Sequence, residues 1–131
     1  MSNKSIILRA FNNIFFEFID KVIYFFPDHT EFKTARTSIE ILKKTNPTII
    51  VKIWFTYVYT PYAEEINNGD INFFINKDYS NDLKDTTDQS RIMKFINDMR
   101  EYVMNVPDEQ KNIIMNYVQN LSKMSVQYAS S

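Results

Sequence analysis

Apolar residues along most of the chain recur at spacings of three and four positions, the period of an α-helix that buries one side. Only one run has the composition of a β-strand, and a single glycine leaves few hairpin turns. The pattern therefore predicts an all-α fold. We expect one domain over residues 1–131, a compact bundle of five or six helices.

The densest apolar and aromatic run lies between Pro47 and Ile66 and contains the only tryptophan, Trp54. Its Ile, Val, Thr, Tyr and Phe residues would also suit a strand, but a strand needs partners, and no second run of similar character exists. On a helix this run is apolar nearly all round, as a core helix is. We therefore predict a buried central helix over residues 47–66.

The ends of this run carry the signals of helix termini. Asn46 can cap, Pro47 falls in the first turn, where proline is tolerated, and Gly69 follows the last periodic residue. Pro61 removes one backbone hydrogen bond and should bend the helix. A membrane span is disfavoured because Lys52 and several threonines interrupt the run.

A first long helix is predicted over residues 6–26, and its apolar side is unusually wide. Either two helices pack on it, or part of it is a surface for self-association or for a protein partner. Its apolar positions at helical spacing are Ile7, Phe11, Ile14, Phe15, Phe18, Val22 and Phe25, widened by Leu8, Ile19, Ile23 and Phe26, with Phe16 further round.

Capping signals place the helices that follow. Asp28 and Glu31 resemble a capping box that opens a helix to residue 44. Asp70 can cap a short helix over residues 71–75, and the polar stretch 76–88 is expected to form a loop.

Two helices are expected to close the chain. Thr86 and Gln89 form a capping box before a helix to about residue 105, and the last helix starts after Pro107. The short connection predicts an antiparallel hairpin, and the final residues, YASS, should fray.

Composition narrows the possible chemistry. Fifteen basic and sixteen acidic residues give a formal net charge of −1, which argues against a general binder of polyanions. The absence of cysteine excludes disulfides, thiolate nucleophiles and cysteine-bound metals. Arg9 interrupts the first apolar run too early for a signal peptide, so we expect an intracellular, cytoplasmic protein.

Candidate catalytic residues are few. His29, the only histidine, is expected to be a neutral surface residue, and one glycine cannot build a phosphate-binding loop. Glu64 and Glu65 are adjacent and point in different directions on a helix, so they do not form a catalytic pair. We predict no catalytic residue, cofactor or small-molecule ligand; a small enzyme with dispersed residues is an alternative.

The acidic loop has some features of a calcium site. Asp78, Ser80 and Asp82 have the spacing of the first ligands of an EF-hand. Leu83 stands where the loop requires glycine, and Gln89 stands where it requires glutamate. We therefore predict no metal site.

Nucleic acid is the first alternative partner. The second predicted helix carries a basic face, and a short turn joins it to the next helix, loosely as in a helix-turn-helix. The following helix is too apolar to read bases, and Glu31 and Glu40 balance the basic face. The candidate contacts are Lys33, Arg36, Lys43 and Lys44.

Tyrosines are the better indication of function. Tyr57, Tyr59 and Tyr62 cluster near Pro61, and aromatic residues with a polar tip are enriched at protein interfaces. The alternative is that they complete the core with their hydroxyls at its rim. With Phe16 and Ile23 on the wide first helix, they are the candidate protein-interface residues.

The chain is rich in Asn, Ile, Lys and Phe and poor in Ala and Gly. With the stretch NPTIIVKIWFTYVYTPYAEEINNGDINFFINKDYSNDL over residues 46–83, it resembles small helical proteins of large nucleocytoplasmic DNA viruses. The resemblance implies an infected cytoplasm or a virion as the setting. Our prediction is a non-catalytic interaction or accessory protein.

Overall fold

The structure is a computed structural model that describes residues 3–76 and 87–131, with side chains described for residues 3–73 and 91–131. The described residues contain no strand, so the all-α prediction is confirmed. The elements are α1 (Asn3–Phe25), α2 (Thr30–Thr45), α3 (Ile49–Ile53), a π-helical segment η1 (Trp54–Tyr59), a 3-10 turn η2 (Thr60–Tyr62), α4 (Ala63–Asn67), α5 (Ile71–Asn76), α6 (Thr87–Val103) and α7 (Asp108–Ser130).

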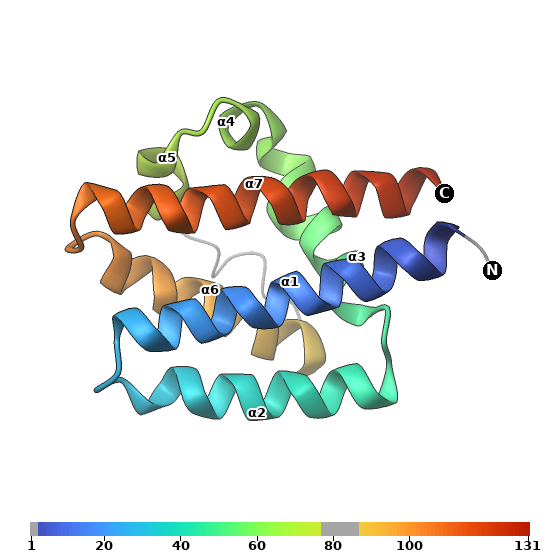
Figure 1. Ribbon diagram of the computed structural model, residues 1–131, viewed down its shortest axis with the longest axis horizontal. Coiled ribbons are helices and arrows are strands. Elements are labelled where there is room, and N and C mark those ends of the chain that lie inside the picture. The colour runs from blue at the N-terminus through green and yellow to red at the C-terminus, as the bar shows by residue number, and fades with distance from the viewer. Residues whose placement is uncertain (1–2, 77–86) are drawn as a thin grey trace.

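The long helices α1 and α7 lie side by side and run in opposite directions, with both chain ends at the same end of the molecule (Figure 1). α2 packs on α1 and α6, and α3 contacts α1, α2, α6 and α7. The wide face of α1 is therefore covered by α2, α3 and α7, which confirms that more than one helix packs on it.

Trp54 is the centre of the core, as its position in the densest apolar run predicts. Its indole is fully buried and meets Phe11, Phe15 and Phe18 edge-on at centroid distances of 6.4, 6.2 and 6.4 Å. Each such aromatic pair contributes about 0.5–1.5 kcal/mol beyond the area it buries. The indole Nε1 donates a hydrogen bond of 3.0 Å to Ser122 Oγ on α7, so the buried N–H has a partner.

The prediction of one central helix over residues 47–66 is wrong in form. The α-helix begins only at Ile49, changes to the π-helical segment η1, tightens into η2 and resumes as α4. Pro61 accounts for the change, because proline offers no N–H and its ring clashes with the carbonyl four residues earlier. The N–H of Thr60 bonds instead to the Phe55 carbonyl, and Thr60 Oγ1 donates to the same oxygen at 2.6 Å.

Burial also divides this stretch. Its first half includes the buried residues Ile50, Val51, Trp54 and Val58. In its second half, Thr60, Pro61 and Glu64 are exposed. After Val58 the next buried residue of this stretch is Ile66, so its burial is interrupted over η2 and the start of α4.

Gly69 turns the chain from α4 into α5, as the helix-end signal predicts. Its φ is +72°, its N–H bonds to the Ile66 carbonyl, and the Asp70 N–H bonds to the Glu65 carbonyl. This pair of bonds is the Schellman arrangement of a helix C-terminus. Asp70 Oδ1 accepts the Phe73 N–H at 3.0 Å, which confirms Asp70 as the cap of the short helix.

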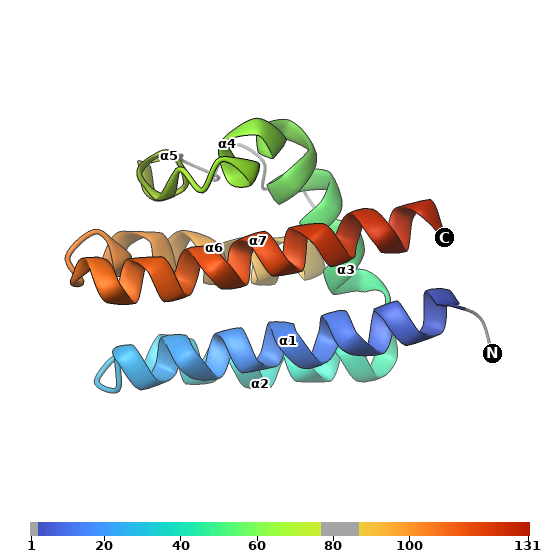
Figure 2. The same cartoon turned by 45° about the horizontal axis from the view of Figure 1, so that its top comes forward.

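We call α4 and α5 together the arm. Figure 2 shows the arm above the layers formed by the long helices. It contacts α7 and α6, and Gln119 Nε2 of α7 donates to the Ile66 carbonyl at 3.0 Å.

Two expected helix ends and the expected closing hairpin differ from the structure. α2 begins at Thr30 with His29 in the N-cap position and no side-chain cap, so the Asp28–Glu31 capping box does not form. α7 continues to Ser130, so the tail does not fray. The closing hairpin is splayed, since α7 packs along α1 while α6 packs on α2 (Figure 1). Thr86 lies outside the described residues.

Candidate functional site

Within the residues that the structure describes there is neither a candidate metal site nor a candidate membrane-spanning helix. They contain no group of His, Cys, Asp or Glu side chains that could hold a metal ion. They also contain no helix long and apolar enough to cross a bilayer. The calcium candidates Asp78, Ser80 and Asp82 lie outside the described residues.

His29 lies in a small cluster rather than standing alone on the surface. The centroid of its ring lies 3.9 Å from the ring centroid of Tyr102 of α6, and its Nδ1 is 3.5 Å from Glu31 Oε1. The backbone N–H of Glu31 and the Tyr102 hydroxyl both donate to the Glu31 carboxylate and lower its pKa. The same bond raises the pKa of Tyr102. The cluster joins the start of α2 to the end of α6.

Beside this cluster a groove of about 370 Å³ is lined by residues of both α2 and α6. Lys94 donates to Asp98 at 2.8 Å within it, and this bond raises the pKa of Lys94. The pKa of Glu31 is lowered and that of Lys94 raised, so both move away from neutrality, opposite to the tuning of a catalytic acid or base. The lining residues are Glu31, Thr34, Ala35, Ser38, Arg91, Lys94, Phe95 and Asp98.

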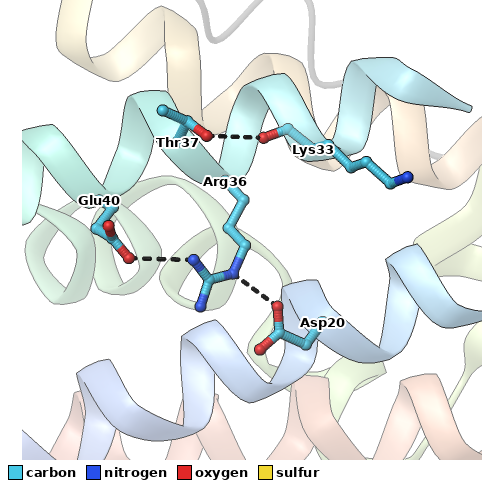
Figure 3. A network of polar contacts seen from close by, with 5 residues as sticks. All are labelled: Asp20, Lys33, Arg36, Thr37 and Glu40. Carbon is cyan, nitrogen blue, oxygen red and sulfur yellow. Dashed lines mark hydrogen bonds and ion pairs between the residues drawn. The ribbon is translucent and has the colours of Figure 1, made fainter.

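The basic face of α2 is partly occupied by contacts within the molecule. Figure 3 shows Arg36 extending between two carboxylates, Asp20 of α1 and Glu40 of α2. The distances are 2.6 Å to Asp20 and 3.1 Å to Glu40, and the bond to Asp20 is the main cause that raises the pKa of Arg36. Lys43 lies over the Phe16 ring at 5.0 Å, whereas Lys33 and Lys44 are exposed. The proposed nucleic-acid residues therefore do not form one free basic surface.

Of the two interface candidates on α1, Phe16 is taken up by internal packing, whereas Ile23 is only partly buried. Phe16 is only 8% exposed, because Arg36 and Lys43 both lie over its ring. Ile23 is half-buried and packs against the core.

The tyrosine candidates lie together at the rim of the core. Tyr57, Tyr59 and Tyr62 are all half-buried and pack against the core, so each has an inner and an outer side. The Phe55 ring stacks on the Tyr59 ring with their centroids 6.3 Å apart. The Tyr62 and Phe73 rings are in contact with their centroids 5.4 Å apart.

The two ring pairs are linked through the arm. Asn67 Nδ2 donates to the Tyr59 hydroxyl at 3.1 Å, which ties the first pair to α4, the helix that begins beside Tyr62. We call the half-buried residues Phe55, Tyr59, Tyr62 and Phe73 the aromatic surface. Sequence reasoning missed Phe55, because the π-helical segment changes which residues of the run share a side.

Comparison of the chain with models of known protein families, with curated proteins and with solved structures found no match.

Proposed function

We propose that this protein is a non-catalytic protein-binding module and that the aromatic surface is its contact region. The observation that carries the proposal is the pairing of half-buried rings, Phe55 on Tyr59 and Tyr62 on Phe73, at the edge of the bundle. Aromatic residues supply a large share of binding energy at protein interfaces, where each ring presents wide apolar area at a small entropic cost.

The π-helical segment supports the same proposal. Such segments are rare and occur frequently at functional sites. Here η1 carries Phe55, Tyr57 and Tyr59 between the buried Trp54 and the exposed Pro61. It therefore places half-buried aromatic rings next in sequence to the fully buried Trp54.

The two alternatives have weaker support. A nucleic-acid partner would need the basic face of α2, yet Arg36 is bonded to Asp20 and Glu40. A small enzyme would need a titratable group tuned towards neutrality, and Glu31 and Lys94 have pKa values that move the other way. The viral setting stays a prediction from the resemblance.

Affinity capture with a tagged chain tests the proposal. Proteins retained by the wild type should be lost with Tyr62→Ser and with Tyr59→Ser, because both changes remove a ring from the aromatic surface. The matched control is Tyr24→Ser, since Tyr24 is 76% exposed on α1, away from the aromatic surface. Circular dichroism should show each variant folded.

Equal retention by all variants would contradict the proposal. Light scattering on the same proteins distinguishes self-association, in which the wild type has twice the mass of Tyr62→Ser, from binding of a foreign partner.

A further inference from the structure

Acidic residues are unevenly distributed along this protein, whose formal net charge is only −1. None of residues 3–16, 41–63 and 110–131 is Asp or Glu. Figure 1 shows that the start of α1, the end of α2, α3 and the end of α7 meet at one end of the molecule. We call this the basic end, because the exposed charged side chains that the structure describes in these stretches are lysine or arginine: Lys4, Arg9, Lys44, Lys52 and Lys123.

A hollow of about 210 Å³ lies at the basic end. Its apolar walls include Val51, Phe55 and Tyr128, and Lys4 and Lys52 are its charged lining residues. Lys4 Nζ lies 4.7 Å from the Tyr128 ring centroid, so its charge is held at the wall by a cation–π contact. Among the residues that the structure describes, the hollow thus combines apolar walls with positive charge and has no carboxylate in its lining.

Size and position indicate the kind of occupant. Pockets for whole small molecules usually measure about 300–1,000 Å³, so this hollow suits a single side chain of a larger partner. Phe55 belongs both to the hollow and to the aromatic surface, which makes the two regions continuous. A polynucleotide would instead need a longer track of cations with several stacked bases.

We infer that the hollow at the basic end binds an acidic segment of a protein partner, with one apolar side chain in the hollow and carboxylates beside Lys4 and Lys52. This inference rests on the proposed function and gives its partner a chemistry. Complementary charge steers the two proteins together, and the buried apolar side chain slows their separation.

Fluorescence anisotropy with a labelled peptide, a phenylalanine flanked on both sides by glutamates, tests the inference on the full chain. Saturable binding is expected, and Lys4→Glu or Lys52→Glu should each raise Kd about tenfold, because an attractive contact becomes repulsive. Lys33→Glu is the matched control: it makes the same change of charge at an exposed site on α2 and should leave Kd within about twofold.

The peptide itself has a control with alanine in place of phenylalanine, which should bind about tenfold more weakly. Equal binding of the two peptides would overturn the inference, and so would an equal effect of Lys33→Glu. Binding of oligothymidylate or of phosphatidylserine vesicles in place of the peptide would overturn it as well. If the peptide does not bind while Tyr62→Ser still abolishes protein capture, the inference of an acidic partner is wrong and the proposed function stands.

Discussion

The hydrogen bond between Trp54 and Ser122 shows how one pair of side chains fixes the core. Both residues are buried, at 0% and 1% exposure, so neither polar group can turn to water if its partner is removed. Ser122→Ala should therefore cost about 1–3 kcal/mol. Trp54→Phe should cost about 2–5 kcal/mol, because it also leaves a cavity.

Urea denaturation of the two single variants and the double variant measures this coupling. The double variant should lose less stability than the sum of the single losses, since it leaves no polar group unpaired. Losses that simply add would show that the bond does not contribute.

Glu31 gives the stability a pH dependence. Because folding lowers the pKa of Glu31 below its ordinary 4.5, the unfolded chain binds more protons there than the folded one in this range. The stabilising contribution is present above pH 4.5 and is lost as the pH falls through the folded pKa. Glu31→Gln should lower the melting temperature at neutral pH and make it fall less steeply below pH 4.5.

Thermal melts of Glu31→Gln and of Glu64→Gln, an exposed glutamate on α4, provide the comparison. If both variants follow the wild-type pH profile, the bonds to Glu31 have no energetic role. The sequence could not reveal this cluster, because Glu31 and Tyr102 meet only once α2 packs on α6.

At the scale of the elements, the turn into α5 depends on a left-handed residue. Gly69→Ala places a Cβ at φ +72° and only 3.2 Å from Gln119 Nε2, the atom that bonds α7 to α4. The change should cost about 1–2 kcal/mol in backbone strain. Asn72→Ala, at an exposed position of α5, is the control and should change the urea midpoint little. An unchanged midpoint in Gly69→Ala would mean that the arm readjusts freely.

The elements also show which parts of the fold the sequence encodes locally. Periodicity predicts the long helices, because each buries a stripe that repeats within its own sequence. Gly69 and Asp70 were likewise predictable, since a helix end depends on nearby residues. The change to a π-helix at Trp54–Tyr59 was not, because Pro61 signals a disturbance and only tertiary packing decides how the backbone accommodates it.

For the whole molecule, the sequence gives a net charge but not where the charges gather. The acidic residues Asp28, Glu31, Asp108 and Glu109 lie where α2 and α7 begin, at the end opposite the basic end (Figure 1). A charge of −1 argues against a general binder of polyanions, yet it does not reveal the local surface for which we infer an acidic protein segment as partner. The hollow at the basic end could not be predicted for the same reason: Lys4, Lys52 and Tyr128 come from three distant parts of the chain.

The distribution of buried residues also predicts where the molecule opens first. α1 and α7 each contribute several fully buried side chains and pack along their length, whereas Ile66 is the one buried residue of α4. Local opening follows such differences in buried contacts. Native-state hydrogen exchange should therefore give amides of residues 63–67 a lower opening free energy than those of residues 14–19 and 114–122.

Urea dependence identifies the mechanism of that exchange. Exchange in α1 and α7 should become faster with urea as steeply as global unfolding does, while exchange in α4 should depend on urea only weakly, because opening the arm exposes little surface. Equal protection and equal slopes throughout would mean that the arm unfolds only with the bundle. The aromatic surface would then be fixed before a partner binds, and binding would leave the exchange of α4 relative to α1 unchanged.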